Sequence, residues 1–133
     1  MNGWIMMNNH VHLISRCKTG FVLPGVIMDL KKFTSRKIEE AIRENTFESR
    51  KEWILWMFKR AGQQNSNNKN FQFWQQDNHP AELYGYETLK QKINYLHANP
   101  IRAGIVYETW HYKYSSAINY CTDMNGMLEW ELV

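Results

Sequence analysis

Alternation of apolar and polar positions predicts a β-strand close to the N-terminus, over residues 4–16. Successive side chains of a strand point to opposite faces of the sheet. His10, His12 and Ile14 should therefore share one face, with the intervening residues on the other. The pattern predicts a strand that presents two imidazoles side by side.

Helical spacing of apolar residues predicts two helices after this strand. Pro24 stands where a helix can begin, because its missing N–H is not needed in the first turn, and the pattern continues to about Asn45. The expected buried stripe of this helix consists of Ile27, Leu30, Thr34, Ile38, Ala41 and Ile42. A second helix is expected over 48–60, with one apolar face formed by Ile54, Met57, Phe58 and Ala61.

The rest of the pattern predicts a loop, a strand and a third helix. Residues 62–70 are polar without periodicity, which is typical of a mobile loop. Residues 71–75 alternate as a strand does and run into turn residues at 77–80. The third helix should cover 86–99, because Pro100 disfavours helical geometry at the residue before it. Its expected core stripe is Leu89, Ile93 and Leu96.

These elements predict an α+β fold with a small antiparallel sheet, followed by an apolar C-terminal piece over 127–133. A chain of 133 residues should form a single domain over 1–133. A composition of 44% hydrophobic and 22% charged residues is typical of a globular protein. The net charge of +3 is compatible with a nucleic-acid partner but does not require one.

The cysteines and the N-terminus bear on the cellular location. Cys17 and Cys121 lack C-x-x-C spacing, so we expect free thiols in a reducing cytoplasm. The apolar run at residues 4–7 is too short for a signal peptide or a membrane span. The expected location is therefore cytoplasmic, with no membrane partner.

His10 and His12 are the first candidates for chemistry. Two imidazoles on one strand face can both reach a single cation. However, five histidines in a chain of this length produce an H-x-H pattern by chance roughly one time in five. The spacing alone leaves a metal site and a coincidence both open.

Tyr95 and Asn99 form the second candidate pair, because residues four apart are neighbours on a helix. At about 100° per residue, Tyr95 lies about 120° away from the centre of the core stripe. A tyrosine off the core face is either a partly exposed packing residue or a functional one. Asn99 offers an oxygen one turn away, which could join the two histidines around a metal ion.

Two further sets of residues are candidates for contacts with DNA. Trp74 could stack on a base, and Gln75 or His79 could contact DNA or support the site; the alternative is ordinary turn chemistry beside a buried Trp. The basic residues could bind phosphates, or they could form a solvated face. They are Lys31, Lys32, Arg36, Lys37 and Arg102.

Four segments resemble motifs of one family. Residues 7–14, MNNHVHLI, resemble the M-P-N-H-x-H-L signature of HUH single-tyrosine transposases. Residues 95–104, YLHANPIRAG, resemble the Y-I-H-x-N-P-V-x-A-G motif of the REP-associated tyrosine transposases. Residues 73–75 and 114–117 are similar to the shorter motifs that flank that block. The resemblance covers nearly the whole chain, and its motifs occur in the expected order.

The resemblance implies a ferredoxin-like antiparallel sheet with helices packed on one face. It also implies Mg²⁺ or Mn²⁺ at His10 and His12, Asn99 as the third ligand and Tyr95 as the nucleophile. The substrates would be single-stranded DNA with hairpin ends. A phenol with a pKa near 10 needs help to attack phosphorus, and a cation on the phosphate would provide it. Attack would leave a 5′-phosphotyrosine and a free 3′-hydroxyl.

The chain departs from the family pattern in two places. Asn8 stands where the family has Pro, which should alter only local stiffness. Family members also carry a strand–helix–strand segment before the histidine strand, so we expect either a start codon assigned too late or an N-terminally truncated, decayed copy. An incomplete sheet should expose an unpaired edge and favour a homodimer. Imidazole ligands favour Zn²⁺ or Mn²⁺ over Mg²⁺, so the preferred metal stays open.

Two other functions remain as alternatives. The first is a non-catalytic, domesticated or decayed remnant that binds DNA hairpins and needs neither Tyr95 nor a metal. The second is a metal hydrolase of another class that uses His10 and His12. Such hydrolases usually recruit carboxylates or more histidines, and none adjoins this pair in the sequence.

Overall fold

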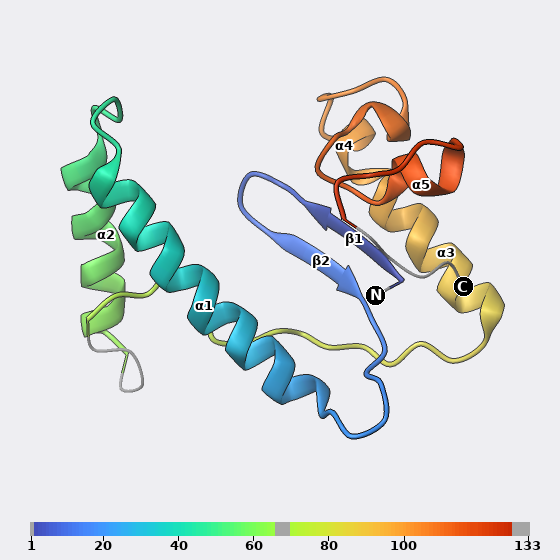
Figure 1. The fold of residues 1–133 in the computed structure, drawn as a ribbon, viewed down its shortest axis with the longest axis horizontal. Helices are drawn as coiled ribbons and strands as arrows, with labels where there is room; N and C mark the ends of the chain where they lie inside the picture. The colour runs from blue at the N-terminus through green and yellow to red at the C-terminus, as the bar shows by residue number, and fades with distance from the viewer. Residues whose placement is uncertain (1, 66–69, 129–133) are drawn as a thin grey trace. The chain divides into compact units, whose positions relative to one another are not determined.

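The computed structural model describes residues 2–65 and 70–128 of the chain. It divides the protein into two compact units, one of Met1–Lys18 with Ala81–Val133 and the other of Thr19–Pro80. Strands occur in the first unit and helices in both (Figure 1), so the predicted α+β class is confirmed. Part of the predicted loop at 62–70 and most of the predicted C-terminal piece lie outside the described residues.

The predicted strand over 4–16 is a hairpin rather than one strand. Strand β1 (Gly3–Met6) pairs antiparallel with strand β2 (Val11–Ile14). The Met7 N–H donates to the His10 carbonyl at 2.8 Å, which closes a turn through the two asparagines between them. Asparagine side chains favour turns by bonding nearby backbone groups, and this turn separates two runs that alternation had joined.

The second edge of β1 is covered by residues 114–116. The Met6 N–H donates to the Tyr114 carbonyl at 2.9 Å, and the Ser116 N–H donates to the Trp4 carbonyl at 2.9 Å. Within 2–65 and 70–128, β2 pairs with β1 alone, which makes β2 the edge strand of the described sheet.

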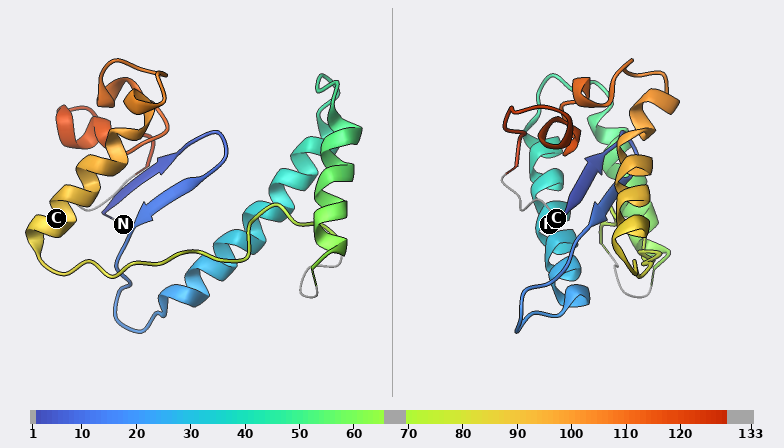
Figure 2. Two further views of the ribbon diagram at one scale, coloured as in Figure 1. Left: turned by 180° about the vertical axis from the view of Figure 1, so that it is seen from behind. Right: turned by 90° about the vertical axis from the view of Figure 1, so that its right-hand side faces the viewer.

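Helix α3 (Tyr86–His97) packs along the hairpin, as Figure 1 and Figure 2 show. Ile93 and Leu96 of its predicted stripe are buried, whereas Leu89 is half-buried. Leu96 joins Ile5 of β1 and Tyr112 in the core cluster of this unit. Burial of a side chain such as Ile5, which is fully enclosed, contributes about 1.5–3 kcal/mol to stability.

The helix predicted over 86–99 is interrupted near its end. Helix α3 stops at His97, and a short helix α4 (Asn99–Arg102) begins two residues later. Pro100 falls in the first turn of α4, where a missing N–H has no cost. The 3-10 helix η1 (Thr109–His111) and helix α5 (Ala117–Cys121) complete the described elements of this unit.

The second unit is built from two helices, α1 (Leu23–Glu44) and α2 (Lys51–Gln63), which pack on each other. Both predicted helices are confirmed, with Pro24 in the first turn of α1. The stripe predicted to be buried on α1 is only partly covered, because no residue of α1 is fully buried. Four of its members are half-buried and two are exposed; the exposed ones are Leu30 and Ala41.

Residues 71–75 do not form the predicted strand. The Gln72 N–H donates to the Phe58 carbonyl of α2 at 3.0 Å, and the rings of Phe71 and Phe73 lie 5.2 and 5.4 Å from the Phe58 ring. A strand needs a neighbouring strand for its hydrogen bonds, and the described part of this unit contains helices only. The alternating aromatic residues therefore pack against a helix.

Both cysteines are free thiols, as the sequence predicts. Among the described residues, no helix combines the length and the apolar character that crossing a membrane requires.

Gly126 should be a sensitive position for stability. A Cβ atom there would overlap the Asn119 Oδ1 and lie 2.9 Å from the Ile118 Cγ2, so Gly126→Ala requires these side chains to shift. We expect a loss of about 1–3 kcal/mol in the free energy of unfolding, measured by urea denaturation. Gly25→Ala in α1 is the matched control, because open space surrounds that position and Ala is the better helix former. Equal midpoints for the two variants would contradict the expectation.

Candidate functional site

The two histidines lie together at the start of β2. Residues two apart on extended backbone share a face, and the ring centroids of His10 and His12 are 4.9 Å apart, edge to face. The His10 Nδ1 is hydrogen-bonded to the Asn9 Oδ1 at 2.7 Å. This bond orients the ring and leaves Nε2 as the nitrogen available to a ligand.

The electrostatics of the pair favour neutral imidazole at His12. Partial burial lowers the pKa of His12 from its usual 6.5, and the neighbouring His10 lowers it further. A metal ligand needs the unprotonated nitrogen lone pair. The surroundings of His12 thus keep it in the form that binds a cation.

Tyr95 lies near the end of α3, off the core face, where the helical pattern predicted it. Its side chain is 51% exposed. The Arg102 guanidinium lies 4.5 Å from the centre of its ring, and the Lys92 Nζ lies 6.0 Å from it. A cation over an aromatic face is attracted by the ring, and both cations would also attract a phosphate beside the phenol.

Asn99 lies one turn beyond Tyr95, at the first position of α4. Its Nδ2 is buried and has no hydrogen-bond partner among residues 2–65 and 70–128. A buried polar atom without a partner costs about 1–3 kcal/mol, which an added ligand would offset. Rotation of the amide by 180° exchanges Nδ2 and Oδ1, and it would put a carbonyl-type oxygen in the unpaired position. That oxygen suits a divalent cation.

The elements that carry these residues lie toward the same end of the first unit. In Figure 1 and Figure 2 the hairpin turn that precedes β2 and helix α4 both lie at the upper end, away from the start of α3. Across 2–65 and 70–128, no group of three or more His, Cys, Asp or Glu could hold a metal ion. The donor set that the sequence predicts, two imidazoles and one amide oxygen, is of a different kind from such a group.

The other predicted DNA contacts lie in the second unit, apart from Arg102. The Trp74 indole N–H donates to the Thr34 Oγ1 at 2.9 Å, and its half-buried ring packs on Phe73. The backbone carbonyl of Gln75 accepts from the Lys31 Nζ at 2.7 Å. These contacts give both segments a packing role within their own unit.

The remaining predicted contacts are exposed. His79 adopts a positive φ of 46°, which is uncommon for a residue other than glycine. On α1, Lys37 is paired with Glu40 at 2.8 Å. Lys32 and Arg36 are exposed one turn apart on the same helix, so they form the basic surface of this unit.

His97 and Ser116 support the site, although the sequence patterns did not single them out for this role. The His97 Nε2 and the Ser116 Oγ are 2.8 Å apart, and the Trp4 N–H donates to the same Oγ at 3.0 Å. The network ties the end of α3, next to Tyr95, to strand β1. Burial lowers the pKa of His97 to about 4, so this imidazole is neutral at physiological pH.

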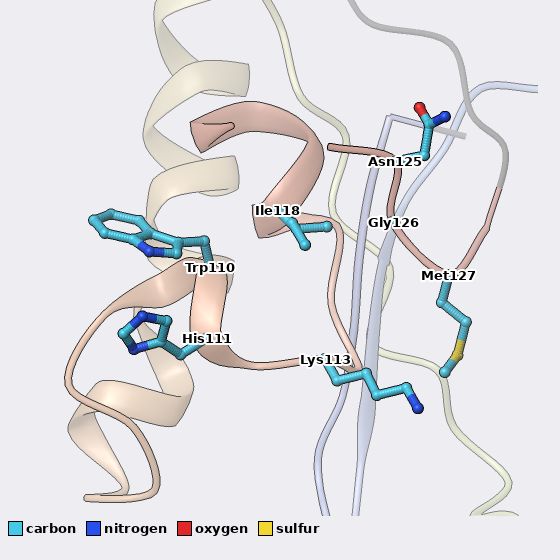
Figure 3. Close-up of a pocket in the computed structure, with 7 residues that line it drawn as sticks. All are labelled: Trp110, His111, Lys113, Ile118, Asn125, Gly126 and Met127. Atoms are coloured by element: carbon cyan, nitrogen blue, oxygen red, sulfur yellow. The ribbon is translucent and has the colours of Figure 1, made fainter. Parts of the chain in front are cut away.

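Two cavities open on the first unit. One, of about 400 Å³, lies between α3 and α5. The other, of about 390 Å³, is lined by η1, α5 and the segment after α5; Figure 3 shows its Trp110, His111 and Lys113 side chains. Neither cavity includes the histidine pair or Tyr95.

Comparison with protein-family models, with curated proteins and with solved structures finds no match to this chain.

Proposed function

We propose that this protein cuts and rejoins single-stranded DNA through a 5′-phosphotyrosine at Tyr95, with the assistance of a divalent cation. The observation that carries the proposal is the environment of the phenol. Tyr95 is exposed beneath the Arg102 guanidinium, one turn before Asn99, whose buried Nδ2 has no partner within the described part of the chain. The proposal includes a ferredoxin-like sheet and a relationship to the REP-associated tyrosine transposases.

The reaction follows from the residues around Tyr95. The phenolic oxygen attacks the phosphorus in line, the bond to the 3′ oxygen breaks, and that oxygen takes up a proton while the phenol releases one. Arg102 and Lys92 balance the negative charge that gathers on the phosphate. The new phosphodiester conserves the energy of the old one, so a second 3′-hydroxyl can reverse the step and join another strand.

His10, His12 and Asn99 would hold Mg²⁺ or Mn²⁺. When bound, the cation polarises the scissile phosphate and neutralises developing charge. The Asn9 bond to the His10 Nδ1 holds the first imidazole in a ligating orientation. Lys32, Arg36 and Arg102 would bind phosphates, and Trp74, Gln75 and His79 would contact the strand.

The metal site can be tested without DNA. His10→Ala and His12→Ala should each lower the affinity for Mn²⁺ by at least about tenfold, because each removes one imidazole ligand. Electron paramagnetic resonance of free Mn²⁺ measures the affinity. His111→Ala is the control, since this exposed histidine on η1 lies outside the pair. If all four proteins bind Mn²⁺ equally, the pair is not a metal site.

The function itself is tested with a pool of single-stranded oligonucleotides that contain hairpins. In the presence of Mn²⁺ the protein should form an adduct that survives denaturation, and peptide mapping by mass spectrometry should find the nucleotide on Tyr95. Hairpin binding without any adduct would favour the alternative of a non-catalytic hairpin-binding remnant.

A further inference from the structure

One side of helix α3 forms a wall of the cavity between α3 and α5. Tyr86, Lys90 and Asn94 follow one another at successive turns of the helix and line the cavity. Tyr120 of α5 lines it from the other side. The volume of about 400 Å³ lies in the range of small-molecule sites.

Aromatic rings form much of this cavity. Tyr86 is 62% exposed at its mouth. Tyr86 and Tyr120 line the same cavity, and the pKa of Tyr120 is raised by burial and by the Tyr86 phenol. The His97 ring lines the cavity and lies 5.2 Å from the Tyr120 ring. The faces of such aromatic rings can stack on a flat, unsaturated ring of a ligand.

The polar groups of the cavity favour an anion attached to that ring. Lys90 is the one formally charged side chain among the described residues that line it, since burial keeps the His97 imidazole neutral. The Asn94 amide can donate to one ring atom and accept from another. A nucleotide combines these features, because its base is a planar ring that hydrogen-bonds through its edge and its phosphate is an anion.

We propose that this cavity binds a nucleotide unit, with the base between Tyr86 and Tyr120, its edge at Asn94 and its phosphate at Lys90. At about 100° per residue, Tyr95 lies on the far side of α3 from Tyr86. The site is therefore separate from the phenol that the proposed cleavage uses. Binding here requires neither Tyr95 nor a metal, so the two proposals can fail independently.

The first experiment titrates the protein with deoxyadenosine 5′-monophosphate and with deoxyadenosine by isothermal calorimetry. Lys90→Gln should lower the affinity for the monophosphate about tenfold and leave the affinity for the nucleoside unchanged, because only the phosphate contacts Lys90. Lys113→Gln is the control, because Lys113 lines the other cavity (Figure 3).

A second pair of variants tests the ring contact. Tyr86→Leu should weaken both ligands by at least about fivefold, because base stacking is lost, whereas Tyr86→Phe should keep the wild-type affinity. Repeating the titration with fluorescein-labelled single-stranded oligodeoxyadenylate separates the two possible sources of the nucleotide. If Tyr86→Leu weakens the affinity for the oligonucleotide as much as that for the monophosphate, the ligand is a unit of a DNA strand. If it weakens only the affinity for the monophosphate, the ligand is a free nucleotide.

Two results would overturn the proposal. One is the absence of saturable binding of the monophosphate by the wild type. The other is an affinity for the monophosphate that neither Lys90→Gln nor Tyr86→Leu changes. Neither result changes the expectation of an adduct at Tyr95. Conversely, the absence of an adduct does not change the expected result of the nucleotide titrations.

Discussion

Tyr95→Phe should abolish the covalent adduct with single-stranded DNA, to below about one thousandth of the wild-type yield. The substitution removes only the attacking oxygen. The ring stays beneath the Arg102 guanidinium, 4.5 Å away, so the surface that receives the phosphate is preserved. DNA affinity, measured by fluorescence anisotropy in Mn²⁺, should therefore change by less than about twofold.

Tyr107→Phe is the matched control for this experiment. Tyr107 is 95% exposed, so solvent and DNA can reach its phenol as easily as that of Tyr95. It has no asparagine one turn away on a helix and no neighbouring cation among the ring contacts of the described residues. The adduct should form normally on this variant. An adduct that persists in Tyr95→Phe would assign the chemistry to another tyrosine.

The exposure of Tyr95 could be predicted from the sequence because it depends on a local property. The helical period fixes the angle between Tyr95 and the stripe of Ile93 and Leu96, and those two residues are buried as predicted. The start of the helix at Tyr86 was predicted correctly, whereas its end at His97 comes two residues before the predicted one. The break between α3 and α4 follows from Pro100, which the sequence displays but which can either end a helix or begin one.

The hairpin was missed although its signal is present. Asn8 and Asn9 are turn residues between two apolar runs, but alternation continues through His10 and His12 and resembles one long strand. The strand predicted at 71–75 failed for the opposite reason. The residues do alternate, but a strand forms only beside another strand. The sequence does not show whether residues 71–75 pack against a strand or a helix.

The support of the site depends on contacts between distant residues. His97 and Ser116 are 19 residues apart, and Trp4 lies 112 residues from Ser116. Both His97 and Ser116 fall within motifs that the sequence displays, but no local pattern shows that their side chains meet. The unpaired buried amide of Asn99 is also visible only once the chain is folded.

His97 should make the fold sensitive to acid, by about 3 kcal/mol between pH 6.5 and pH 4. Above pH 6.5 the imidazole is neutral in both the folded and the unfolded chain, so pH has no effect through this group. Burial lowers the pKa of His97 to about 4 in the folded state. Below pH 6.5 the unfolded chain therefore takes up a proton that the folded chain does not, and the free energy of unfolding falls until about pH 4.

His97→Gln isolates this effect, because Gln does not titrate and can still hydrogen-bond the Ser116 hydroxyl. Urea denaturation of both proteins at several pH values from 4 to 7 gives the free energy of unfolding of each. The variant can be less stable than the wild type at pH 7, but the difference should shrink by about 3 kcal/mol as the pH falls to 4. Titrations of surface groups such as Glu40, whose pKa the Lys37 ammonium lowers, occur in both proteins and cancel. Parallel curves for the two proteins would mean that His97 is not held neutral by burial, and that the link between α3 and β1 does not depend on its protonation.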